Sequence, residues 1–166
     1  MVASRHVSSA LRVVPPAGGP VQSVFALLMA SATASSLYIV NKSGGLIFQR
    51  DFGGGAKLDT NDTLRLASIW HSLHAISAQL SPRPGCGGIE LLETDTFDLH
   101  CFQAPTGTKF FVTSAPHALG AAPLLRVVYE LYADFVLKNP FYEAEMPIRC
   151  ELFDAHLAAA IKAAPV

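Results

Sequence analysis

The hydrophobic pattern of the first half of the sequence changes from a strand period to a helix period. Residues 36–40 and 46–50 are rich in β-branched and aromatic side chains, and the turn-forming residues 41–45 between them predict a β-hairpin. Beyond a glycine-rich loop at 52–57, apolar residues recur at steps of three and four, which predicts a helix. Its stripe consists of Leu66, Ile69, Trp70, Leu73, Ile76 and Leu80.

The ends of this predicted helix are marked by residues with distinct backbone preferences. Thr60 or Asn61 is expected to cap the N-terminus, because a short polar side chain accepts a hydrogen bond from an unpaired backbone N–H of the first turn. Ser81 and Pro82 predict the end of the helix, since proline disfavours helical backbone in the residue before it.

The second half of the sequence adds three strands and two helices. Strand patterns at 89–93, 97–103 and 109–113 are separated by connections too short for a crossover, so the strands are expected to be antiparallel neighbours. A helical stripe then runs from 124 to 135, and a last helix at 151–163 has acidic residues at its start and a lysine near its end, as the helix dipole favours. The order β-β-α-β-β-β-α-α predicts an α/β (α+β) fold with helices sandwiching a five-stranded antiparallel sheet.

Composition and charge narrow the class of partner. Only 15% of the 166 residues are charged and 51% are hydrophobic, whereas soluble domains average about 25% charged. A small domain of this balance is expected to leave apolar surface outside its own core, and such surface usually contacts another protein. The net charge of −1 gives no electrostatic basis for binding nucleic acid.

The first 35 residues differ in character from the rest. They contain no acidic residue, and a Pro/Gly-rich bend at 15–20 divides them. We expect residues 1–35 to be a flexible N-terminal extension and residues 36–166 to be the folded domain. A basic, then apolar, then small-residue layout around residues 24–34 also fits a secretory or transit signal.

Candidate catalytic and metal-binding residues are few. His71 and His74 are three residues apart on a helix and could share a zinc ion, but no third ligand is recognisable nearby. His100 and Cys101 are neighbours on a strand, so their side chains point to opposite faces and cannot act as a nucleophile pair. Phosphate-binding loops and hydrolase motifs are absent from the sequence. We therefore assign no catalytic, metal or cofactor-binding residue and expect no cofactor.

The long connection at residues 138–149 has the composition of a protein interface. It is rich in Phe, Tyr, Met and Arg, residue types that are enriched at interface centres, and two prolines restrict its backbone. The alternative is that it only packs a long connection onto the core. Together with the first helix, which we expect to serve an interface as well as the core, it supplies the candidate interface residues Trp70, His71, Asn139, Phe141, Tyr142, Glu145, Met146 and Arg149.

This connection also carries a resemblance to a known family. Residues 137–142 and 145–154 resemble the C-terminal signature of synbindin-type small core subunits of the TRAPP vesicle-tethering complex, in the longin-like sybindin family. Residues 36–49, 66–82 and 88–101 resemble the opening hairpin, first helix and central strands of the same family, in the same order. Many members carry a PDZ-like insert after the second strand; here only the glycine-rich loop occupies that place.

The resemblance implies a longin-like domain without the insert and a non-catalytic role. The implied function is that of a TRAPP subunit in ER-to-Golgi vesicle transport, contributing to the core that acts as guanine-nucleotide exchange factor for a Rab GTPase. The implied partners are the other TRAPP small subunits and the Rab GTPase of that step. The implied location is cytoplasmic and peripheral at ER and Golgi membranes, through the complex, which argues against a secretory signal.

Two other classes of protein remain as alternatives. One is a different longin-type adaptor module of membrane trafficking. The other is a small hydrolase or metal-dependent enzyme that uses His71, His74 or a cysteine. Native purification separates them, because a subunit brings sibling proteins whereas an enzyme is active alone.

Overall fold

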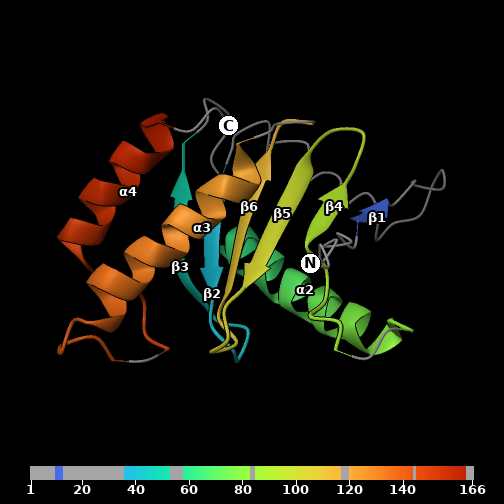
Figure 1. Ribbon diagram of the computed structural model, residues 1–166, viewed down its shortest axis with the longest axis horizontal. Coiled ribbons are helices and arrows are strands. Elements are labelled where there is room, and N and C mark those ends of the chain that lie inside the picture. Colours follow the sequence, from blue (N-terminus) through green and yellow to red (C-terminus); the bar gives the residue numbers. More distant parts are fainter. Residues whose placement is uncertain are drawn as a thin grey trace, which may run out of the picture.

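A computed structural model of the chain describes six stretches, residues 10–12, 36–52, 58–82, 85–116, 120–143 and 145–163. One six-stranded sheet has the strand order β1-β4-β5-β6-β2-β3 (Figure 1). The strands are β1 Ala10–Arg12, β2 Ser36–Val40, β3 Leu46–Asp51, β4 Leu91–Glu93, β5 Asp98–Gln103 and β6 Lys109–Ser114. The helices are α2 Thr60–Leu80, α3 Ala121–Leu131, the π-helical segment η1 Tyr132–Leu137 and α4 Glu151–Ala163.

The five strands from β2 onward form the predicted antiparallel sheet. β2 pairs with both β3 and β6, β5 pairs with β6 and β4, and every one of these pairings is antiparallel. The predicted longin-like order of strands and helices is therefore confirmed. β1 adds a sixth strand that the hydrophobic pattern did not predict, because three residues are too few to show a period; it pairs with β4 in parallel.

Helices cover both faces of the sheet, with α2 on one side and α3, η1 and α4 on the other (Figure 1). The alternation of side chains along β2 divides the core accordingly. Leu37 and Ile39 lie in the cluster under α3 and α4, whereas Tyr38 and Val40 lie in the cluster under α2. Tyr38 stacks on Phe111, with ring centroids 4.7 Å apart.

The helix α2 begins and packs differently from its prediction. Its N-cap is Asp59 rather than Thr60 or Asn61, and the Thr63 hydroxyl donates to the Asp59 carbonyl oxygen at 2.9 Å. The apolar stripe also divides, since Leu66 and Trp70 are buried with Thr63, Ala67 and His74. The outward-facing members of the stripe are Ile69, Ile76 and Leu80, at 43%, 53% and 77% exposure. Thr63, Ala67 and His74 occupy core positions, although a stripe of large apolar residues does not include them.

The second predicted helix is confirmed over most of its length, but its C-terminal end is π-helical. α3 passes at Tyr132 into η1, which ends at Leu137 just before Asn139 and Pro140. Such π-helical turns are rare and frequently lie at functional sites. This one leads directly into the connection between residues 138 and 150.

We predict that residues 1–35 are dispensable for assembly. Apart from β1, this extension lies outside the described residues, and β1 contributes only a three-residue pairing at the edge of the sheet. A chain that begins at Ser36 should melt near the temperature of the full chain and bind its partner subunits equally well, as measured by thermal denaturation and co-purification. Loss of the partners on truncation would show that the domain boundary is wrong.

Candidate protein interface

The candidate interface is built on the connector, which we define as residues 138–150 between η1 and α4. Its C-terminal part lies along the edge strand β3, where the Ile148 backbone N–H donates to the Ile47 carbonyl oxygen at 2.9 Å. Beyond it, Arg50 of β3 donates from Nη1 to the Asp154 carbonyl oxygen at 2.9 Å and lies 3.3 Å from its carboxylate. These contacts hold the connector and the start of α4 against the sheet.

The first turn of the connector presents an aromatic ring to solvent. Asn139 organises this turn, because its side-chain oxygen accepts from the Phe141 N–H at 3.0 Å and its carbonyl oxygen accepts from the Tyr142 N–H at 3.0 Å. Phe141 is 94% exposed. Tyr142 is partly buried, and its hydroxyl donates to the Met146 carbonyl oxygen at 3.2 Å. The exposed Phe141 ring therefore stands on a turn that its neighbours constrain.

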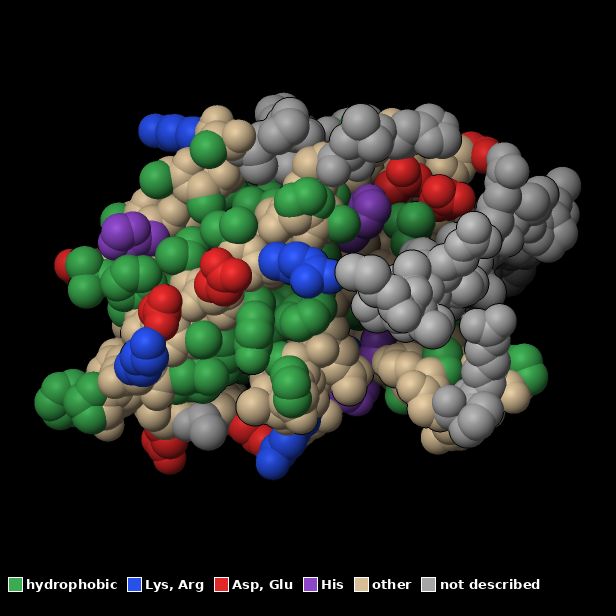
Figure 2. Space-filling view, viewed as in Figure 1, with side chains coloured by type: hydrophobic (Ala, Val, Ile, Leu, Met, Phe, Trp, Pro, Cys, Tyr) green, Lys and Arg blue, Asp and Glu red, His purple; other side chains and the backbone are tan. Residues whose placement is uncertain are grey.

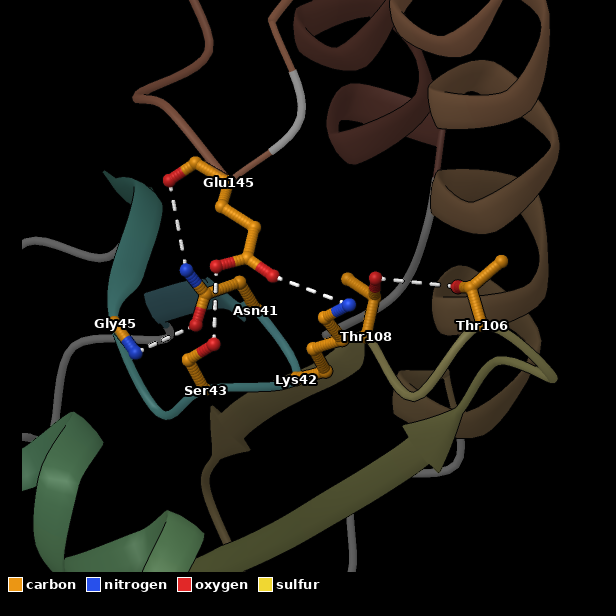
Figure 3. Close-up of polar contacts among 7 residues, drawn as sticks. All are labelled: Asn41, Lys42, Ser43, Gly45, Thr106, Thr108 and Glu145. Atoms are coloured by element: carbon orange, nitrogen blue, oxygen red, sulfur yellow. Dashed lines mark hydrogen bonds and ion pairs between the residues drawn. The ribbon is translucent and has the colours of Figure 1, made fainter.

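Glu145 fastens the connector to the β2–β3 turn (Figure 3). Its carboxylate accepts from the Ser43 hydroxyl at 3.0 Å and lies 3.5 Å from the Lys42 ammonium. Its carbonyl oxygen accepts from the Asn41 amide at 3.5 Å. Glu145 also has a φ of 73°, a left-handed conformation that side chains with a Cβ seldom adopt. Strain of this kind persists only where surrounding contacts fix it, and these three contacts do so.

A cavity of about 320 Å³ lies between the β2–β3 turn, the β5–β6 turn, η1 and the connector. Polar and apolar side chains both line it; the lining residues are Asn41, Lys42, Ile47, Thr106, Thr108, Tyr132, Leu137, Tyr142 and Glu145. Burial, together with the neighbouring Tyr132, raises the pKa of Tyr142 to about 12, so its hydroxyl remains a neutral donor. The cavity offers hydrogen-bond donors and acceptors without an activated nucleophile.

The surface around this cavity is unusually apolar. Besides Phe141, Met146 is 54% exposed and Leu137 is 49% exposed. Figure 2 shows the α3–α4 side of the molecule, where hydrophobic side chains lie in the open between scattered charged ones. Arg149 is exposed at the end of the connector. Apolar area edged by charge is the arrangement of a protein interface.

The candidate residues on α2 separate into a core residue and a surface residue. Trp70 is completely buried, so its assignment as a contact residue is wrong; it packs 5.7 Å from Phe111, centroid to centroid. His71 is partly exposed and packs against Gly44 of the β2–β3 turn, since a Cβ there would lie 3.1 Å from its ring. Residues 41–45 therefore contact His71 of α2 as well as Glu145 of the connector.

Behind His71 lies a buried basic group. Lys109 is 6% exposed, and its Nζ is 3.4 Å from His71 Nδ1. Burial and the Lys109 charge both lower the pKa of His71. Burial, Lys109 and His71 lower the pKa of His74 to about 4, so this histidine is neutral in the folded chain. The His74 ring leaves no room for a side chain at Gly88, where a Cβ would lie 2.4 Å away.

The chemistry considered for these histidines and cysteines finds no support. No group of three or more His, Cys, Asp or Glu side chains suited to a metal occurs in the described stretches, so His71 and His74 gain no third ligand there. Burial raises the pKa of Cys101 to about 12, which leaves the thiol protonated and unreactive. A larger cavity of about 520 Å³ near β5 is lined by His74, His100 and Cys101 among others.

Within the portion of the chain that the structure describes, every helix is too short or too polar to span a bilayer.

Comparison with known proteins identifies the class of protein to which this fold and surface belong. The sequence profile described as the Sybindin-like family matches residues 34–164, so this chain belongs to the Sybindin-like family. It is 56% identical over 126 residues to trafficking protein particle complex subunit 4 of Dictyostelium discoideum, covering 75% of this chain and 93% of that protein. It is 58% identical over 111 residues to the human subunit 4.

The match to mammalian relatives is partial on their side. The human alignment covers 67% of this chain and 51% of the human protein, so the chain spans about half the length of such relatives. Among solved structures, MglB of Myxococcus xanthus is 20% identical with a TM-score of 0.44, over 68% of this chain and 89% of that one. A Roadblock/LC7 domain from Streptomyces avermitilis is 21% identical with a TM-score of 0.42, over 55% and 72%.

Sequence analysis missed four residues of this region: Asn41, Lys42, Ser43 and Lys109. The first three were assigned only to a turn, because nothing local shows that a residue about one hundred positions later binds there. Strand alternation gave a signal for Lys109, since positions 109 and 111 share a face and Phe111 is a core residue.

We predict that Glu145→Gly will be more stable than Glu145→Ala, by about 1 kcal/mol in the free energy of unfolding. Both changes delete the contacts with Lys42 and Ser43, but only glycine adopts the left-handed backbone without strain. Urea denaturation of the two variants measures the difference. Equal stability would show that the backbone at this position relaxes freely and that Glu145 is not held in a strained conformation.

We also predict a pH dependence of stability that comes from His74. Its pKa is about 4 in the folded chain against an ordinary 6.5, so the unfolded chain binds a proton first as the pH falls. The stabilisation from neutral His74 should be complete above about pH 6.5 and decline towards pH 4, with about 2 kcal/mol lost between about pH 7 and pH 5. Urea titrations of wild type and His74→Leu at both pH values measure this loss. A variant as acid-sensitive as the wild type would contradict the assignment.

Proposed function

We propose that the chain is a non-catalytic subunit of a TRAPP vesicle-tethering complex in ER-to-Golgi transport. It contributes to the core that acts as guanine-nucleotide exchange factor for the Rab GTPase of that step. Membership of the Sybindin-like family and the 56% identity to a trafficking protein particle complex subunit 4 support the complex as its setting. The other small subunits are then its permanent partners, and membrane association is peripheral, through the complex.

The connector supplies the surface for this role. The observation that carries the proposal is Phe141, 94% exposed on a turn whose backbone is hydrogen-bonded to Asn139 and whose far end is fastened by Glu145. A large apolar ring held open to solvent contributes nothing to the folding of this chain. Because its turn is already ordered, a partner that covers the ring loses little conformational entropy on binding.

Exchange activity requires no catalytic side chain. An exchange factor accelerates nucleotide release by binding the nucleotide-free GTPase more tightly than the loaded one, which is a difference in affinity between two states. A rigid apolar surface with charges at its edge is suited to such binding. The protonated Cys101 thiol gives no support to the hydrolase alternative.

A different longin-type trafficking adaptor is the second candidate. It would use the same surface but would co-purify with other partners, so mass spectrometry of a native purification decides between the two. Recovery of sibling TRAPP subunits supports the first function, and recovery of a coat or SNARE assembly without them supports the second.

We predict that Phe141→Ala will weaken the binding of a partner subunit or the GTPase without unfolding the domain. Truncation of a central apolar anchor typically costs about 2 kcal/mol, roughly thirtyfold in affinity. The double variant with Tyr142→Ala should lose more, because it also removes the hydroxyl bonded to Met146. Calorimetric titration and a nucleotide-exchange assay with the assembled complex measure the effect.

Glu143→Gln is the matched control on the same connector. Glu143 is exposed, and a charge at the edge of an interface affects mainly the association rate. This variant should retain nearly full affinity and activity. If Phe141→Ala is folded, fully assembled and fully active, the connector is only a packing element and the proposal fails.

A further inference from the structure

Lys109 places an ammonium group in the interior of the domain without an anion beside it. The residue begins β6 and is only 6% exposed. Its Nζ lies 3.4 Å from His71 Nδ1 and 3.5 Å from the Gly107 carbonyl oxygen, and neither group is charged. Among the described residues, no carboxylate forms an ion pair with it. Lysine is almost never buried to this extent unpaired, because an isolated charge is costly to remove from water.

Two hydrogen-bond donors at this site have no acceptor assigned among the described residues: the third proton of Lys109 and the Nε2–H of His71. An ammonium has three protons and no acceptor, so contact with His71 requires Nδ1 to be the acceptor and Nε2 to carry the proton. Two of the Lys109 protons are directed at His71 and Gly107, and the third is unassigned. His71 is partly exposed, so its ring can be reached from outside the domain.

The Glu145 carboxylate at the β2–β3 turn is already paired. Glu145 joins the same β2–β3 turn against which His71 packs, but its carboxylate is paired with Lys42 and Ser43. Glycines occupy the turn positions beside the basic pair, Gly44 against the His71 ring and Gly107 next to Lys42. A side chain at either position would crowd its neighbour, so both turns pack closely beside the basic pair.

We propose that Lys109 and His71 form a receptor site for a carboxylate of a partner protein, an Asp or Glu side chain that pairs with them when the complex assembles. The inference rests on the assembly part of the proposed function. A side-chain carboxylate fits better than a phosphate group, since one ammonium balances one carboxylate charge. In the assembled state the Lys109 ammonium is paired with an anion, which the free chain lacks. The site therefore stabilises only a complex whose partner places an acidic side chain beside Lys109.

Lys109→Met tests the site because it separates folding from binding. Methionine has a similar length and no charge, so removal of an unpaired buried ammonium should leave the melting temperature of the free chain unchanged or higher. Its affinity for the purified partner subunits should fall by at least about tenfold, because the partner carboxylate is then buried without a cation. Lys162→Met, which alters an exposed lysine in the last turn of α4, should change neither quantity.

The pH dependence of lysine acetylation by acetic anhydride, read by mass spectrometry, gives a second test that needs no variant. Burial lowers the pKa of Lys109 in the free chain, and pairing with a carboxylate should raise it on assembly. A Lys109→Met chain that binds with wild-type affinity, or an unchanged Lys109 pKa in the complex, overturns the carboxylate site while the proposed function stands. A wild-type chain that binds no sibling subunit overturns the proposed function, and this site with it.

Discussion

The structure depends on a sheet whose central strands are buried on both faces. Every residue of β2 and β6 is buried, so neither strand has a face that water can solvate. Such a sheet is stable only when helices cover both sides, and the chain meets this requirement in sequence order. α2 covers one face after the first hairpin, and α3, η1 and α4 cover the other after the third strand of the meander.

This two-sided requirement explains why the chain contains a long connector. α3 and η1 cover only part of their face, and α4 packs over β2 and the edge strand β3, where Phe153 is buried with Ile39 and Ile47. The connector spans the distance between them along the edge of β3, which also covers an edge that would otherwise be open to other strands. A segment needed for folding is thus placed on the surface, where its outward-facing residues are free to contact another protein.

Much of the fold could be predicted from period and turn chemistry alone. The hairpin, the antiparallel meander and the last helix depend on local patterns, and the 151–163 helix was predicted with its observed bounds. The side of α2 that faces the core could not be predicted in full, because His74 and Thr63 are buried for reasons of tertiary packing against Gly88 and the sheet. The connector was identified from its composition. Its attachment through Asn41, Lys42 and Ser43 could not be, since a contact across one hundred residues leaves no local signal.

The buried polar groups indicate that the isolated chain is not at its stability optimum. A core could hold apolar residues at positions 74 and 109, yet this one holds a neutral histidine and an ammonium without an anion, and it keeps Glu145 in a left-handed conformation. Each of these costs free energy in the free domain. Glu145 contacts the β2–β3 turn and Lys109 lies behind the His71 ring that packs on it, while Phe141 stands exposed on the connector that this turn anchors. Costs concentrated in one region are expected where a surface is shaped for a partner rather than for the stability of the domain alone.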